Sequence, residues 1–150
     1  MIAHGVPGID IHQTHDFPAP PSVVFRALTL HLDRWFPAAL RLTGPGARLV
    51  LLPELGAQLT ETGPQGGAIW GHVDRIEPDR RLYFCGSFGV PGLVMGRVQF
   101  ELEPIGAGCR LQLSHQGIGP VSEDRVERQR AIWREVLGVA LRGHLAGVAV

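Results

Sequence analysis

The C-terminal stretch from Ser122 to Gly147 constrains the fold more than any other part of the sequence. Its apolar residues recur every three or four positions, which predicts one face of a long amphipathic helix. These residues are Val126, Trp133, Val136, Leu137, Ala140, Leu141 and Leu145. Ser122 is suited to cap the start of the helix and Gly147 to end it. The opposite face is rich in arginine, places Asp124 and Arg128 at i,i+4, and is expected to be solvated.

A single long amphipathic helix needs one large apolar surface, and the preceding sequence predicts a sheet. A first strand is predicted at 9–17, followed by two short helices in PAPPSVVFRALTL and HLDRWFPAAL. Six further strands are predicted at 47–53, 56–62, 67–77, 80–88, 95–103 and 109–116, with Gly- and Pro-rich turns between them. Short connections indicate an antiparallel meander. The predicted class is α+β, in the order β-α-α-β-β-β-β-β-β-α.

Two of the predicted strands show which side faces the helix. Val98, Phe100 and Leu102 alternate with polar residues, and Leu111, Leu113 and His115 do the same in the next strand. This alternation is typical of a sheet with one covered face and one solvated face. For four residues, the local pattern does not show whether the side chain points to the covered or to the solvated face of the sheet. They are Trp70, His72, Tyr83 and Cys85.

Composition limits the classes of function. The 150 residues predict one domain, with residues 1–8 as a loose end, and the formal net charge of zero gives no support for nucleic-acid binding. No apolar run approaches the roughly 20 residues of a membrane span, and no secretory signal is evident, which favours a cytoplasmic protein. The seven His do not follow metal-site spacing, and no cofactor motif is found. Cys85 and Cys109 fall on strands about 9.6 Å apart, so two free thiols are expected.

Four stretches, in order, carry a resemblance to a known family. They are APPSVVFRALTLHLDRWFP, GHVDRIEPDRRLYF, VQFELEPIGAGCRLQLSHQGIG and the helix around Trp133. The chain resembles the SRPBCC superfamily, the helix-grip proteins related to START and Bet-v-1-like domains, and within it the activator-of-heat-shock-protein-ATPase-like branch. The doubled Trp of that family corresponds here to Trp35-Phe36, a departure. The resemblance implies a curved sheet wrapped around the C-terminal helix with a cavity between them. Glycines at 71, 86 and 96 offer places for the strands to bend.

We expect function to reside in this cavity. Residues from several predicted elements would form its wall. They are Trp35, Phe36, Trp70, His72, Tyr83, Phe100, Leu113, His115, Trp133 and Leu137. His115 is the best polar candidate, because it shares a face with Leu111 and Leu113. The structural alternative is that His115 is a buried histidine bonded to a backbone carbonyl.

Three functions are consistent with these features. The favoured one is binding of a small hydrophobic molecule such as a lipid, an aromatic compound or a polyketide-like metabolite, without a cofactor. The second is a metal-free enzyme of the polyketide cyclase or dehydratase type, with His115, His72 and Tyr83 as candidates for proton transfer. The third is a module that regulates a chaperone ATPase, as the family branch implies. An exposed edge strand would also permit a homodimer.

Overall fold

The computed structural model describes residues 8–148 and contains one seven-stranded antiparallel sheet in the order β1-β7-β6-β5-β4-β3-β2. The strands are β1 (Gly8–Phe17), β2 (Arg48–Val50), β3 (Gln58–Gly63), β4 (Gly66–Glu77), β5 (Arg81–Cys85), β6 (Met95–Ile105) and β7 (Gly108–Ile118). All seven predicted strands are present, and the α+β class is confirmed. Of the loose end expected at residues 1–8, Gly8 belongs to β1, and residues 1–7 lie outside the described residues.

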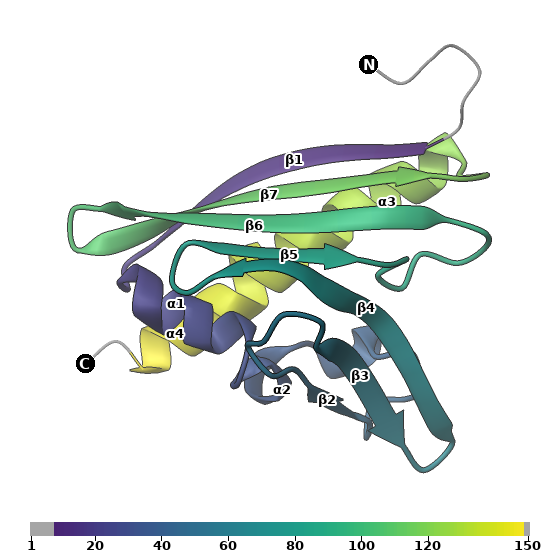
Figure 1. Cartoon of the computed structure of the whole chain (residues 1–150), viewed down its shortest axis with the longest axis horizontal. Helices are drawn as coiled ribbons and strands as arrows, with labels where there is room; N and C mark the ends of the chain where they lie inside the picture. Colours follow the sequence, from purple (N-terminus) through teal and green to yellow (C-terminus); the bar gives the residue numbers. More distant parts are fainter. Residues whose placement is uncertain (1–7, 149–150) are drawn as a thin grey trace.

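Two groups of helices connect and cover the sheet. Between β1 and β2 lie α1 (Pro21–Leu28), α2 (Leu32–Trp35) and the 3-10 turn η1 (Ala38–Leu40). The C-terminal helix comprises α3 (Glu123–Glu135), the π-helical segment η2 (Val136–Leu141) and α4 (Arg142–Val148). Ser122 caps α3 as expected, because its hydroxyl accepts a hydrogen bond from the Arg125 amide at 3.1 Å. In Figure 1 this helix lies across one face of the sheet.

The covered face of the sheet holds the apolar residues that the strand patterns predicted. Val98, Phe100 and Leu102 of β6 are buried, and so are Leu111, Leu113 and His115 of β7. The partners of β7 are β1 and β6, with Ile11 and Val98 opposite His115. From the helix, Trp133, Leu137, Leu141 and Leu145 pack into the same core.

The sheet bends where β4 carries its irregularities. Register shifts occur between Leu59 and Thr60 and between Val73 and Arg75, and such bulges increase local bending and twist. In Figure 1, β2 and β3 turn away from the direction of β5–β7.

The glycines expected to allow bending lie in a row across β4, the end of β5 and β6. A Cβ atom at Gly86 would lie 2.6 Å from the Gly71 Cα, and a Cβ at Gly96 would lie 2.7 Å from the Gly86 carbonyl oxygen. Gly86 also has a φ of +153°. Only glycines allow the three backbones to approach this closely.

Strand β5 is shorter than the sequence predicted. It ends at Cys85 rather than at Phe88. The chain turns there, because Gly86 and Phe88 (φ 51°) adopt positive φ values and the Phe88 amide donates to the Trp70 carbonyl at 3.0 Å. This turn directs the Phe88 ring back into the core.

Candidate functional site

An internal cavity of about 310 Å³ lies between the sheet, the α1–β2 segment and the C-terminal helix. Most of its wall is apolar. It includes Leu28, Leu32 and Leu40 from the helices after β1, Leu49 and Leu59 from β2 and β3, and Ile132, Val136 and Leu137 from the C-terminal helix. Three exposed residues, Ala39, Leu42 and Arg128, also line it, so the cavity opens to solvent between η1 and α3.

Aromatic rings form a continuous path along the cavity wall. Phe36 lies 6.2 Å from Trp35 and 5.5 Å from Trp70, centroid to centroid. The path continues from Trp70 to Phe88 at 5.7 Å and from Phe88 to Trp133 at 6.0 Å. Phe84 and Phe100 extend it across β5 and β6. The wall therefore presents both flat aromatic faces and ring edges to any bound molecule.

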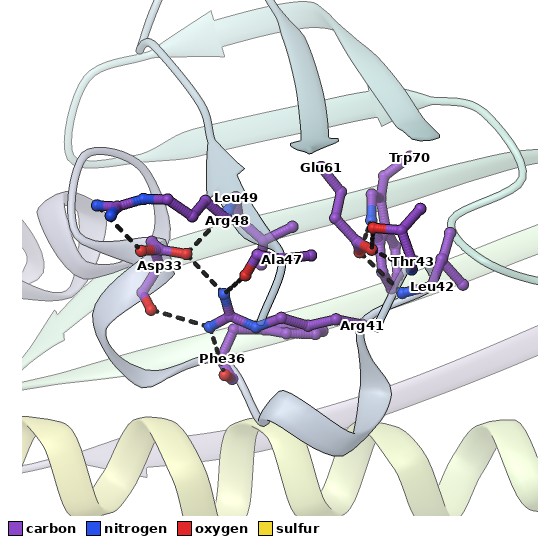
Figure 2. Close-up of polar contacts among 10 residues, drawn as sticks. All are labelled: Asp33, Phe36, Arg41, Leu42, Thr43, Ala47, Arg48, Leu49, Glu61 and Trp70. Atoms are coloured by element: carbon purple, nitrogen blue, oxygen red, sulfur yellow. Dashed lines mark hydrogen bonds and ion pairs between the residues drawn. The ribbon is translucent and has the colours of Figure 1, made fainter. Parts of the chain in front are cut away.

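Two acidic residues, Asp33 and Glu61, hold the segment between α2 and β2 in place (Figure 2). Asp33 accepts hydrogen bonds from the Arg41 Nη1 at 2.6 Å and from the Leu49 amide at 2.8 Å. Arg41 also donates to the carbonyl oxygens of Phe36 and Ala47. Burial acts to raise the pKa of Asp33, but the hydrogen bonds and the arginine charge outweigh it, and its pKa is lowered from the usual value.

Glu61 is the second of these two acidic residues. It is fully buried, and it accepts hydrogen bonds from the Leu42 amide, the Thr43 amide and hydroxyl, and the Trp70 indole. Burial would raise the pKa of Glu61, but these donors together lower it below its usual value. Trp70 is thus fixed on one side of the cavity by the same carboxylate that fixes residues 42 and 43.

The structure brings six of the ten predicted wall residues to the cavity. They are Trp35, Phe36, Trp70, Phe100, Trp133 and Leu137. Leu113 and His115 face the helix as predicted, but both are packed in the core and do not line the cavity.

His115 is held against the C-terminal helix by a side chain and not, as the structural alternative expected, by a backbone carbonyl. The Trp133 indole donates to the His115 Nδ1 at 2.9 Å. The second ring nitrogen, Nε2, is buried and has no partner among residues 8–148. Burial lowers the pKa of His115 to about 4.

The other two polar candidates lie away from the cavity, which corrects the sequence prediction. His72 is exposed, opposite Cys85 in the β4–β5 ladder. Tyr83 is buried on the polar face of the sheet, where its hydroxyl donates to Glu101 and where Arg75 and Arg97 lie over its ring at 5.7 and 5.5 Å. Burial and Glu101 raise the pKa of Tyr83. His115, His72 and Tyr83 therefore do not form one catalytic cluster.

The polar part of the cavity wall was not predicted from the sequence. Arg41, Arg125, Arg128 and Gln129 line the cavity, although the arginine-rich face of the last helix was expected to be solvated. Phe84 and Phe88 were also missed, because the pattern of their strand was ambiguous. The i, i+3, i+4 spacing of Arg125, Arg128 and Gln129, with Trp133 one turn after Gln129, is the signal that could have found the polar group.

The remaining structural predictions concern thiols, metals and membranes. Cys85 and Cys109 are free, with β6 between their strands. Within residues 8–148, no group of three or more His, Cys, Asp and Glu side chains is placed to hold a metal ion. The helices of the described part of the chain include none that is long and apolar enough to cross a membrane.

Comparison with solved structures supports the fold. Protein MLL2253 from Mesorhizobium loti has a TM-score of 0.71 at 19% identity, covering 91% of this chain and 96% of that one. DynU16, described as a putative protein in the dynemicin biosynthetic locus, has a TM-score of 0.68 at 22% identity, covering 93% of this chain and 48% of that one. PFC0360w, described as an HSP90 activator from Plasmodium falciparum, has a TM-score of 0.67 at 15% identity, covering 94% and 96%. At these identities the likeness shows the fold alone.

Comparison at the level of sequence gives the family. A search of curated protein sequences found no match. The family model described as Activator of Hsp90 ATPase homolog 1-like protein matches residues 18–146, which is most of the chain. This match confirms the resemblance drawn from the sequence. The antiparallel sheet and the long C-terminal helix have the helix-grip arrangement that the resemblance implies. The chain therefore belongs to the Activator of Hsp90 ATPase homolog 1-like family of the SRPBCC superfamily.

Proposed function

We propose that this protein binds a small hydrophobic molecule in the internal cavity. The observation that carries the proposal is the cavity itself, about 310 Å³ in volume, lined mainly by apolar and aromatic side chains and open to solvent between η1 and α3. Pockets of this size and lining are typical of small-molecule sites. All three Trp residues of the chain line it, so binding would be visible in their fluorescence.

The neutral fluorescent probe N-phenyl-1-naphthylamine tests the proposal. We expect its emission to rise and shift to the blue in the presence of the protein, because the probe enters an apolar environment. Ile132→Trp would fill part of the cavity from α3 and should weaken probe binding by about tenfold or more, since overpacking removes the space that the probe needs.

The matched control is Val139→Trp. Val139 is on the same C-terminal helix but is 69% exposed, and it does not line the cavity. This variant should bind the probe like the unmodified protein. The proposal fails if the probe does not bind, or if Ile132→Trp and Val139→Trp bind it equally well. Native mass spectrometry of gently purified protein would complement the titration by revealing a co-purified small molecule.

Regulation of a chaperone ATPase is a second candidate. It is favoured by the family match over residues 18–146 and by the description of the Plasmodium falciparum structure as an HSP90 activator. Under this candidate function, adding the protein to purified Hsp90 should change the rate of ATP hydrolysis, and Ile132→Trp should keep the effect because the cavity is not required. An unchanged rate at saturating protein would argue against it.

A further inference from the structure

The polar residues of the internal cavity carry positive charge or an amide, and no carboxylate lines the cavity within the described chain. They are Arg41, Arg125, Arg128 and Gln129. The last three occupy positions i, i+3 and i+4 of α3, so they project from the same side of one helix. The acidic residues of α3 are all exposed and do not line the cavity. They are Glu123, Asp124, Glu127 and Glu135.

Two of the three arginines are available to a ligand. Arg41 is already engaged by Asp33 and three backbone carbonyl oxygens. Arg125 and Arg128, in contrast, form no ion pair with any acid of residues 8–148, and Glu127 pairs with Arg130 instead. The pairing of Asp124 with Arg128 that the sequence spacing allowed is not formed. The Nε of Arg125 is buried without a hydrogen-bond partner in this part of the chain.

Gln129 adds an uncharged polar group to the same part of the cavity wall. The residue is only 4% exposed, yet its carboxamide makes no hydrogen bond to the described residues and lies on the cavity wall. Its amide atoms keep accessible surface, so a molecule in the cavity can reach them. An oxygen atom of a bound molecule, placed beside α3, would accept from this amide and from the neighbouring guanidinium groups.

We propose that the molecule bound in the cavity is an amphipathic organic carboxylate. Its apolar body would lie along the aromatic path between Trp70 and Trp133, and its carboxylate would be held near the opening by Arg125, Arg128 and Gln129. This inference rests on the proposed binding function and specifies its ligand. Guanidinium groups bind carboxylates through strong, paired hydrogen bonds, whereas a cationic head group would meet uncompensated positive charge.

Three ligands of equal chain length test the inference: decanoate, 1-decanol and decylamine. Each is titrated against the protein loaded with N-phenyl-1-naphthylamine at neutral pH, and displacement of the probe is measured. Decanoate should bind about tenfold to a hundredfold more tightly than decanol, because a hydrogen bond to a charged group is stronger than one between neutral groups. Decylamine should bind more weakly than decanol.

Paired variants locate the source of this preference. In the double variant Arg125→Met, Arg128→Met, the affinity ratio of decanoate to decanol should fall to about one, because both free charges beside the cavity are lost. The control is Arg130→Met, Arg134→Met, which removes the same number of charges from α3 at positions outside the cavity lining. The control should keep the full preference. Gln129→Leu should lower the ratio in part.

Failure of the carboxylate inference can be distinguished from failure of the proposed binding function. If decanol and decanoate bind with equal affinity, or if the two double variants lose the preference equally, the carboxylate inference is wrong while the binding function stands. If the naphthylamine probe itself does not bind, both the inference and the proposed function are wrong. Chemical denaturation of each variant confirms that the substituted proteins are folded.

Discussion

At the scale of single residues, the Trp133–His115 pair explains why a histidine lies inside the core. The Trp133 indole donates to Nδ1, so the neutral ring must carry its proton on Nε2. Protonating Nδ1 would break this hydrogen bond and place a charge in an apolar interior. Burial therefore lowers the pKa of His115 to about 4. Near neutral pH the buried ring is therefore uncharged, and its Nδ1 accepts from Trp133 on the cavity wall.

This pair predicts a pH dependence of stability. Above pH 6.5, the usual histidine pKa, His115 is neutral in both folded and unfolded states and has no effect. As the pH falls below 6.5 only the unfolded chain gains the proton, so the free energy of unfolding should drop by about 2 kcal/mol down to pH 5 and by about 3 kcal/mol in total near pH 4.

The variant His115→Gln isolates this effect. Its carboxamide oxygen can accept from the Trp133 indole, but it does not titrate. Urea unfolding at pH 7.5, 6 and 5 should therefore show a flatter profile for the variant than for the unmodified protein. Parallel profiles would contradict the prediction. Asp33 and Glu61, whose pKa values are lowered, lose their contributions at more acidic pH and do so in both proteins.

At the scale of elements, the strands and the long helix could be predicted from sequence because each has one buried face. Val98, Phe100 and Leu102 alternate with polar residues, and apolar residues recur every three or four positions around Trp133. In both cases the residues that the pattern assigns to one face are buried or partly buried in the structure. Where both faces are partly buried, the pattern fails. Tyr83 is buried under arginines on the polar face, and Phe88 reaches the core only through a turn with positive φ.

The polar contacts that hold residues 41–43 in place could not be predicted, for a related reason. The partners of Arg41 lie 5 to 8 positions away in the sequence, and those of Glu61 lie 9 to 19 positions away. These separations follow no helix or strand period, so no local pattern indicates the contacts. The π-helical segment Val136–Leu141 was likewise missed, since a helical repeat in sequence does not distinguish it from an α-helix. The predicted end of the helix at Gly147 falls within α4, whose last described residue is Val148.

The segment between η1 and β2 gives a prediction at this scale. Glu61→Gln keeps the size of the side chain but replaces one acceptor oxygen with an NH₂ group that faces donors, including the backbone amides of Leu42 and Thr43. At least one buried donor then loses its partner, which should lower the free energy of unfolding by about 1–3 kcal/mol.

Amide hydrogen exchange provides the local measurement. In Glu61→Gln, the amides of Leu42 and Thr43 should exchange faster with solvent. The exchange rates of amides in the β6–β7 ladder should rise only by the amount that the lower free energy of global unfolding accounts for. The control is Glu54→Gln, at an exposed position. Unchanged protection of residues 42 and 43 in the Glu61 variant would show that the carboxylate does not hold this segment.

At the scale of the whole molecule, the bent sheet and the C-terminal helix close around a space that is not filled by their own side chains. Strands β1 and β7 contribute buried residues to the core but none to the cavity lining, whereas Leu59 of β3 and Trp70 of β4 line the cavity. A molecule bound in this space would contact the sheet and the C-terminal helix at the same time. A ligand should therefore stabilise the whole fold and not only the residues that it touches.

This arrangement predicts ligand-linked stability. N-phenyl-1-naphthylamine at a hundred times its Kd should raise the free energy of unfolding by about 2.7 kcal/mol if only the folded protein binds it. Urea unfolding, monitored by circular dichroism so that the probe does not interfere, measures this gain. Ile132→Trp should show a much smaller gain, and Val139→Trp should show the full gain. An equal gain in Ile132→Trp would mean that the probe stabilises the protein from a surface outside the cavity, since filling the cavity from α3 would then have no effect on the linkage.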